Sequence, residues 1–441
     1  MQVGAKQGAA LIAVLWILTI MGTITMLFSR QANMSLKINR NVMDGAQASL
    51  LAEAGIERGI AELVKDDQET TSDHLKESWS DNQTSFGDVQ LGRGIYRVVH
   101  QDPDQENLDV YGLVDECSKL NINVADKNML QQLPNMTEDV ADSILDWVDS
   151  DSNPRPLGAE IDYYQSLPEP YMAKNGNFDT VDELLLVKGM TLELLYGEDT
   201  NHNGILDTNE NDGAQSYPLD NQDGILDRGW YPYITVYSYE KNVSGNKEQR
   251  VNINSADLET MREKLGKALT DVEINTIIST RQQNNFQSVG DLLSVQPGGG
   301  GNSNNNSSSN TGAITKEKLR QIIDLITVTD DQKLVGRINV NTVPATVLKC
   351  LVRDNDQLVQ NILEYRRSGS APFDDIGELL DVQGMTDNVF RQLTQWVGTK
   401  SSVFSARSIG YVANTKAYKE IYAILDRGAD TPQIRYWKEI R

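Results

Sequence analysis

The sequence predicts an α+β fold in which a long N-terminal helix precedes an antiparallel sheet, and a large, mainly helical insertion interrupts that sheet. Three observations predict this fold. An uncharged apolar run near the N-terminus continues as an amphipathic helix, alternating segments occur towards both ends of the remaining chain, and a sequence repeats three times between them. A length of 441 residues suggests two or three domains.

The first element is a helix that begins as a membrane span. No charged residue lies between Lys6 and Arg30, and residues 9–28 read AALIAVLWILTIMGTITMLF. About 20 residues at 1.5 Å each cross the roughly 30 Å hydrocarbon core of a bilayer. A plain signal anchor is the simplest interpretation. A cleaved secretory signal fits less well because no small-x-small site follows. Apolar residues then keep to one stripe, so we expect a single helix over about 9–65.

Strands are expected on both sides of the insertion, because apolar and polar residues alternate there. The expected strands are 94–99, 108–115, 403–412, 418–425 and 433–440, with a further β run, YPYITVYSY, at 231–239. The sheet must therefore pair residues that are far apart in the sequence.

The insertion contains a threefold repeat. The motif KLNIN at 119–123 recurs as RVNIN at 250–254 and RINVN at 337–341. Each copy precedes a helical run and then a segment that starts with Phe178, Phe286 or Phe373 and contains a Leu-Leu pair. The Asn-x-Asn segment ends a short strand and caps the following helix, and a second helix then ends at Gly189, Gly298 or Gly384. Such units resemble SAM-like or helix-hairpin-helix modules.

Helix-hairpin-helix units can bind DNA, but the charge argues against it here. The whole chain carries a formal net charge of −23, and residues 119–195 contain 5 basic against 14 acidic side chains. Phosphate binding needs clustered Lys and Arg. We therefore expect no nucleic-acid partner, and we interpret the modules as packed units for protein contact.

A calcium loop is predicted at 199–210, which reads DTNHNGILDTNE. The ligand positions of a twelve-residue EF-hand loop would be filled by Asp199, Asn201, Asn203, the Ile205 carbonyl, Asp207 and Glu210. An acidic solvated loop is the alternative. A degenerate copy follows with Leu219 at position one, and its acidic residues make a second site plausible: Asp212, Asp220, Asn221, Asp223 and Asp227.

The sequence gives little support for enzyme activity, and its two cysteines leave two possibilities open. No nucleophile elbow, Walker loop or zinc-protease motif occurs, so we expect no enzyme activity. Cys117 and Cys350 could form a disulfide in an oxidising compartment or remain two free buried thiols.

Two groups of motifs resemble a known family. A short leader that ends in Gly8, followed by AALIAVLWIL and an amphipathic helix, resembles the N-terminus of type IV pilins and pseudopilins. The insertion carries motifs similar to the K-type minor pseudopilin of type II secretion: VDECSKLNIN at 114–123, ILDW at 144–147, GAE at 158–160, YY at 163–164, PY at 170–171 and ELLLVKGM at 183–190. With the C-terminal strands, the resemblance covers most of the chain.

The resemblance implies processing, location and partners. A prepilin peptidase would cut between Gly8 and Ala9 and methylate the new amino terminus. Most pilins carry glutamate at mature position five, which is Ala13 here. A subunit without that glutamate is expected at the fibre tip, with I-type and J-type minor pseudopilins beside it and the major pseudopilin fibre below. The resemblance implies an inner-membrane anchor with a periplasmic head, and it raises the expectation of paired calcium sites in the insertion.

Two alternatives remain open: a minor type IV pilin with an adhesin-like tip, and a membrane-anchored, calcium-stabilised binding module. On the preferred interpretation, the type IV pilin-like chain divides into a leader (1–8), the transmembrane half of the helix (9–28), the rest of the helix with the first strands (29–118), repeat one with the calcium loops (119–230), a strand with repeat two (231–336) and its flexible linker (297–312), repeat three (337–398) and the C-terminal strands (399–441).

Overall fold

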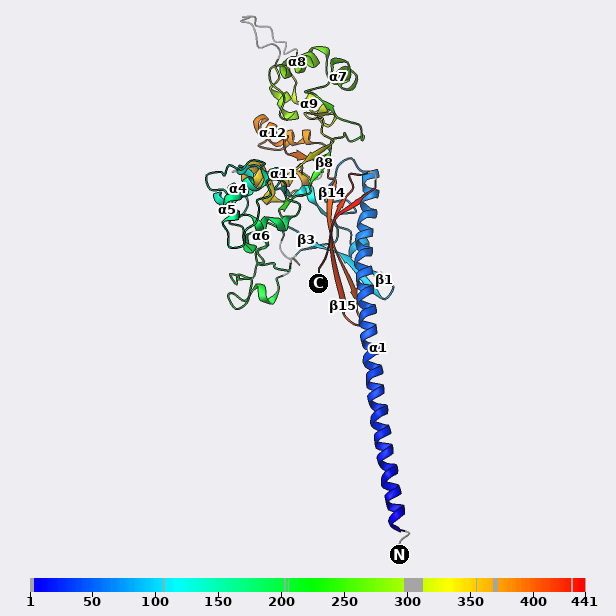
Figure 1. Ribbon diagram of the computed structural model, residues 1–441. Coiled ribbons are helices and arrows are strands. Elements are labelled where there is room, and N and C mark those ends of the chain that lie inside the picture. The colour runs from blue at the N-terminus through cyan, green and yellow to red at the C-terminus, as the bar shows by residue number, and fades with distance from the viewer. Residues whose placement is uncertain are drawn as a thin grey trace, which may run out of the picture.

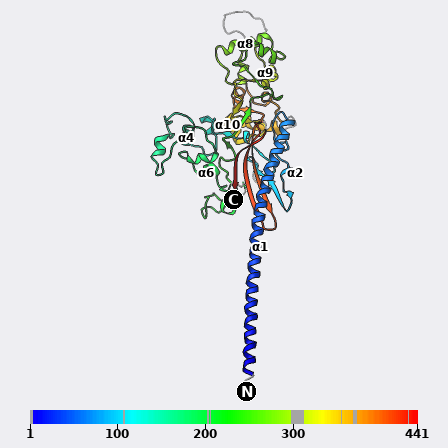
Figure 2. The same ribbon diagram turned by 45° about the vertical axis from the view of Figure 1, so that its right-hand side comes forward.

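The computed structural model describes residues 4–105, 108–201, 204, 206–296, 312–353, 355–367, 372–429 and 431–440. Figure 1 shows one long helix that projects from a head made of a sheet and several small helical units. Figure 2 shows the same arrangement after a turn of the molecule.

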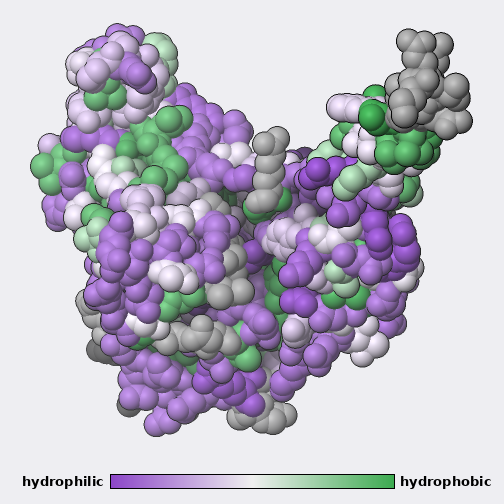
Figure 3. Space-filling view, turned by 90° about the horizontal axis from the view of Figure 1, so that it is seen from below, coloured by the Kyte–Doolittle hydropathy of each residue, from purple (hydrophilic) through white to green (hydrophobic). Residues whose placement is uncertain are grey.

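The long helix, α1, spans Gly4–Glu69. It is four residues longer at its C-terminal end than the sequence predicts, and its first half leaves the head entirely (Figure 1). Every side chain from residue 10 to 43 is exposed, and burial begins at Asp44. Among the described residues, α1 is the one helix long and apolar enough to cross a membrane. Seen from below in Figure 3, hydrophobic surface covers the projecting end of α1, whereas most of the head is hydrophilic.

One antiparallel sheet packs against the second half of α1. Its order is β1 (Val89–Leu91), β2 (Gly94–Val98), β14 (Val403–Val412), β15 (Ala417–Asp426) and β16 (Gln433–Ile440), and β5 (Val114–Asp115) also pairs with β14. The register joins Tyr96 to Gly410 and Val98 to Ser408, so strands from the two ends of the chain lie side by side. The sheet that the sequence predicts is confirmed.

A first hydrophobic core lies between α1 and the sheet. Its buried residues include Leu51, Ile56 and Leu63 from the helix, and Phe404 and Leu425 from the strands. At Gly410 an added Cβ would lie 1.9 Å from the Ala48 carbonyl oxygen, so a larger residue would push the helix off the sheet. The upper half of α1 is therefore fixed to the sheet by close packing.

The insertion consists of three modules, each closed by a parallel pair of two-residue strands. Module one (120–235) is closed by β6 (Leu120–Asn121) and β7 (Ile234–Thr235). Module two (251–327) is closed by β9 (Val251–Asn252) and β10 (Ile326–Thr327). Module three (338–398) is closed by β12 (Ile338–Asn339) and β13 (Val397–Gly398). The modules share a second, larger hydrophobic core. Module two lies farthest from the N-terminus (Figures 1 and 2).

The remaining elements are short. Module one contains α3 (Lys127–Leu130), α4 (Glu138–Val148), α5 (Ile161–Gln165), η2 (Val181–Leu186), α6 (Leu192–Tyr196) and η3 (Thr208–Glu210). Module two contains α7 (Leu258–Leu265), α8 (Asp271–Arg281), η4 (Val289–Ser294), α9 (Lys316–Ile322) and η5 (Ile323–Leu325). Module three contains α10 (Ala345–Val352), α11 (Asp356–Arg367), η6 (Ile376–Asp381) and α12 (Asp387–Leu393). Outside the modules lie α2 (Gln83–Phe86), β3 (His100–Gln101), β4 (Asp109–Val110), η1 (Glu116–Ser118), β8 (Tyr239–Lys241) and β11 (Lys333–Val335).

Several local expectations need correction. The run at 231–239 is not one strand: it contributes β7 and the first residue of β8, and β7 closes module one instead of opening repeat two. The expected strand at 108–115 is two short strands, β4 and β5. The second helix of each repeat is a six-residue 3₁₀ helix, η2, η4 or η6. Gly189 and Gly384 follow with φ of +84° and +87°, whereas Gly298 lies outside the described residues.

Candidate metal sites in the insertion

The repeated asparagines hold each module together. The side-chain Oδ1 of Asn123, Asn254 and Asn341 accepts the backbone N–H of Phe178, Phe286 and Phe373 at 2.7, 2.9 and 2.8 Å. Each Nδ2 donates back to the carbonyl oxygen of the same phenylalanine at 2.9–3.1 Å. One amide therefore ties the strand end to the start of the second helical segment in every module. Such a firm scaffold can position the loops of module one.

In the first predicted calcium loop the described acidic residues are near enough to influence one another's charge, but within the described residues their oxygens do not all lie within 4.8 Å of one another. Glu210 is only 1% exposed, and burial, with the charges of Asp199 and Asp207, raises its pKa above the ordinary value. Asn201 Nδ2 donates to Asp207 Oδ2 at 2.7 Å, and the Gly204 amide donates to Asp199 Oδ2 at 2.8 Å. Asn203 and Ile205 lie outside the described residues. A divalent cation would have to draw these oxygens closer together to bind all of them.

Gly204 makes the turn that the loop pattern requires. Its φ is +71°, in the left-handed region that favours glycine. An added Cβ would also lie 2.4 Å from the side chain of Gln101. The sequence therefore places glycine at a loop position that needs it.

The second loop gains a residue that the sequence did not indicate. Asp220 accepts the amides of Asp212 and Gly213 at 2.9 and 2.7 Å, and Asn221 donates to Asp223 at 3.0 Å. Glu198 is 7% exposed and accepts the Asp227 amide at 3.3 Å. Burial and the charges of Asp227 and Asp220 raise the pKa of Glu198. Glu198 therefore lies beside the second loop and is a further candidate ligand there, where Leu219 offers no carboxylate.

A third acidic group lies between α4 and α5. One carboxylate oxygen from each of Asp149, Asp151 and Glu160 lies within 4.8 Å of the others. Glu160 is only 3% exposed, and within the described residues neither of its carboxylate oxygens has a hydrogen-bond partner. Burial, with the charges of Asp146, Asp149 and Asp151, raises its pKa.

Neighbouring oxygens complete this group. Asp149 Oδ1 and Asn175 Oδ1 are also buried without a hydrogen-bond partner in the described part of the chain. Asn175 Nδ2 donates to the Asp151 carbonyl at 2.5 Å, which places that amide beside the carboxylates. Four buried acceptor oxygens without donors are costly unless a positive ligand satisfies them. The residues therefore fit a calcium ion, which prefers six to eight oxygen ligands.

The other residues singled out in the sequence lie in α1 or in the buried part of the head. Gly8, Ala9 and Ala13 lie within α1, and Ala13 is exposed. Cys117 and Cys350 are free and fully buried, so the disulfide alternative is wrong and the two-thiol alternative is confirmed. Burial raises the pKa of both thiols, which makes them unreactive.

Comparison with known proteins agrees with this architecture. Residues 118–196 match the family model "Type II secretion system (T2SS), protein K", and residues 335–397 match a helix-hairpin-helix motif. Proteins named type II secretion system protein K are 25% identical over 201 residues in Pectobacterium carotovorum, 28% over 195 in Pseudomonas aeruginosa and 30% over 205 in Aeromonas hydrophila. These alignments cover 42–43% of this chain and 57–60% of the relatives.

A solved structure also resembles the chain. It is the GspK-GspI-GspJ complex from enterotoxigenic Escherichia coli, with a TM-score of 0.47, 12% identity, and coverage of 93% of this chain and 99% of the matched one.

A long apolar helix whose second half packs on an antiparallel sheet gives a pilin-like fold, and the exposed half of that helix is long and apolar enough to cross a membrane. The motifs in its helical insertion are similar to those of one family. Over part of its length, the chain is similar to type II secretion system protein K.

Proposed function

We propose that the chain is a minor pseudopilin that lies at the tip of a type II secretion pseudopilus and starts its assembly. The observation that carries this proposal is the insertion: its first module carries the protein K match and lies beside the sheet, and its second module lies beyond the sheet, on the side away from the anchor (Figure 1). A head of this size on a pilin-like stem would block addition of another subunit above it.

The first helix supports the anchoring part of the proposal. Its exposed half, residues 10–43, would lie in the inner membrane and then against the helices of neighbouring subunits. A prepilin peptidase would cut between Gly8 and Ala9. With alanine at position 13, the chain lacks the carboxylate that in a pilin would pair with the amino terminus of an earlier subunit. A tip subunit has no earlier neighbour and so does not need that carboxylate.

The proposed partners are the I-type and J-type minor pseudopilins, with the major pseudopilin fibre below and a periplasmic location for the head. We also propose calcium as the ion of the acidic loops in module one. The buried oxygens around Glu160 and Glu210 support this assignment. Bound calcium would stabilise the insertion that the tip presents.

Co-purification tests the assembly. The full-length chain, extracted in detergent, should retain I-type and J-type partners in calcium and lose part of them in EDTA. The Ile38→Asp variant should lose them, because Ile38 lies on the exposed apolar stripe of α1. The Lys37→Asp variant, one position round the helix, is the matched control and should keep them. Failure of the unmodified chain to retain either partner would reject the proposal.

A further inference from the structure

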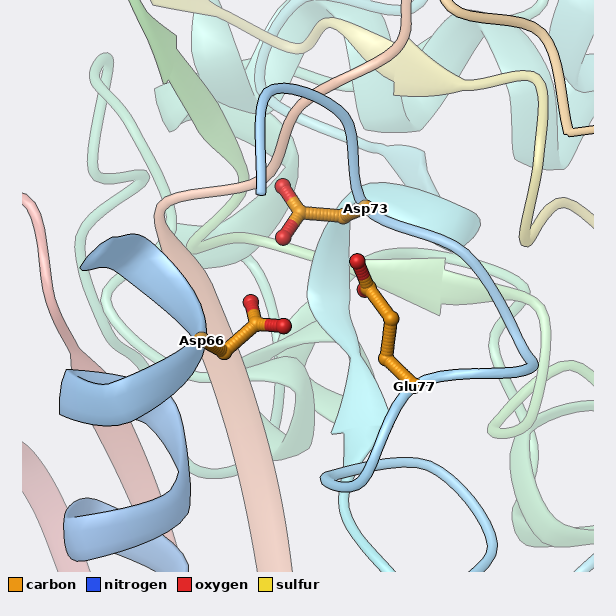
Figure 4. Close-up of side chains that lie close together, drawn as sticks. All are labelled: Asp66, Asp73 and Glu77. Carbon is orange, nitrogen blue, oxygen red and sulfur yellow. The ribbon is translucent and has the colours of Figure 1, made fainter. Parts of the chain in front are cut away.

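Three buried carboxylates meet where α1 ends, outside the insertion. Asp66 lies near the C-terminal end of α1, and Asp73 and Glu77 follow in the segment that leads away from it. Figure 4 shows the three side chains pointing toward one another. One oxygen from each lies within 4.8 Å of the others, although the residues are only 4%, 2% and 8% exposed.

The guanidinium group of Arg427 forms hydrogen bonds with two of these carboxylates. Arg427 Nη1 donates to Asp66 Oδ2 at 2.7 Å, and its Nη2 donates to Asp73 Oδ1. His74 Nε2 lies 3.7 Å from Glu77 Oε1, too far for a hydrogen bond. Three ionised carboxylates and one arginine give the cluster a net charge of −2 in a buried place, where uncompensated charge is costly, and Glu77 has no bonded cation among the described residues.

One carboxylate oxygen of Glu77 indicates that the cluster binds a further group. Its Oε2 accepts the His74 amide at 2.9 Å and the Trp79 indole N–H at 2.7 Å. Its Oε1 has no hydrogen-bond partner within the part of the chain that the structure describes. The Glu77 side chain is only 5% exposed, so water does not replace that partner from bulk solvent.

We propose that Asp66, Asp73 and Glu77 bind a divalent cation of the hard, oxygen-preferring class, with calcium as the ion. One divalent cation and Arg427 together balance three carboxylates. Carboxylate oxygens are the ligands that calcium prefers.

The ion would fasten the stem to the head. The Asp73 amide donates to the Thr399 carbonyl at 2.8 Å, and Asn339 Nδ2 donates to the Asp73 carbonyl at 3.0 Å. Asn339 belongs to β12 of module three, whereas Asp66 belongs to α1. A cation shared by Asp66 and Asp73 therefore connects the membrane helix to the insertion through two ligands.

Metal content of the full-length chain tests the proposal. The background variant Glu160→Gln/Glu198→Gln/Glu210→Gln removes carboxylates from the candidate sites of module one. After equilibrium dialysis against calcium, addition of Glu77→Gln should lower the bound calcium by one ion per chain. Asp67→Asn is the matched control, since Asp67 pairs with Lys247 outside the cluster, and it should leave the content unchanged. Equal calcium content with and without Glu77→Gln would overturn the proposal, because protons alone then satisfy the cluster.

Terbium luminescence gives a second measurement that leaves all three carboxylates of the cluster in place. The Trp79 indole donates to Glu77, so excitation of Trp79 should sensitise a terbium ion bound there. In the same background, the Trp79→Phe variant should lose this emission and keep its bound calcium. If the emission persists in Trp79→Phe, or is absent from the background chain, the proposal fails.

Discussion

At the scale of single residues, the repeated asparagine explains why the three modules share a motif. Asn341 is 2% exposed, and its amide occupies both backbone groups of Phe373, 32 residues later. The first asparagine of the motif makes one local bond, since Asn339 Oδ1 accepts the Asn341 amide at 3.0 Å, and one distant bond, since its Nδ2 donates to the Asp73 carbonyl at 3.0 Å. The sequence shows that both asparagines recur, but the partner of the second is visible only in the fold.

The Asn341→Ala variant should therefore destabilise the chain. It leaves two buried backbone groups without partners, which costs on the order of 2–4 kcal/mol. Urea unfolding monitored by circular dichroism measures the change. Asn388→Ala, at an exposed position of α12, is the control and should change the free energy of unfolding by less than about 0.5 kcal/mol. Equal stability of Asn341→Ala and the unmodified chain would contradict this role.

At the scale of elements, the sequence predicts some parts well and misses others for physical reasons. Strands β14 and β16 have the predicted bounds, because eight to ten alternating residues give a clear period of two. Two-residue strands such as β6 and β7 carry no period. The loop at 199–210 can be recognised in the sequence because its candidate ligands lie close together in the chain, whereas the group around Glu160 includes Asn175 from another segment.

Calcium should stabilise the chain partly through Glu160. We expect the melting temperature to rise in calcium over EDTA, since an ion at 100 times its dissociation constant contributes about 2.7 kcal/mol. The Glu160→Gln variant should melt higher than the unmodified chain in EDTA, because it buries no charge, and should gain less from calcium. Glu169→Gln, at an exposed position, should behave like the unmodified chain. A full calcium response in Glu160→Gln would exclude Glu160 as a ligand.

At the scale of the whole molecule, the sheet and the modules line a partly open cavity of about 550 Å³. Arg407 of β14, Tyr231 of module one and Thr342 of module three line it together with His100. Burial lowers the pKa of His100 to about 4, although its Nδ1 lies 3.4 Å from the Gly112 carbonyl. The head therefore holds a neutral imidazole where its parts meet.

This histidine predicts a pH dependence of stability. The unfolded chain has a histidine pKa near 6.5, so it takes up the proton before the folded chain does. The stability present above about pH 6.5 should fall as the pH drops towards about 4, and His100→Gln should show a shallower fall. Urea midpoints in EDTA across this range measure the effect. If both proteins show the same slope, His100 has the same pKa in the folded and the unfolded chain, which contradicts the prediction.

The pairing of β2 with β14 also sets an order of events during synthesis. More than 300 residues separate Val98 from its partner Ser408, so the central strand β14 leaves the ribosome after all three modules, followed only by β15 and β16 among the strands of the sheet. Until then the helix face with Leu51, Ile56 and Leu63 has no strands from the C-terminal end to cover it. Closing so long a loop is entropically unfavourable unless its contents are already compact. Each module is closed by its own pair of strands and therefore provides that compactness. The C-terminal strands then have a shorter distance to cover before they pair with β2 and pack on α1.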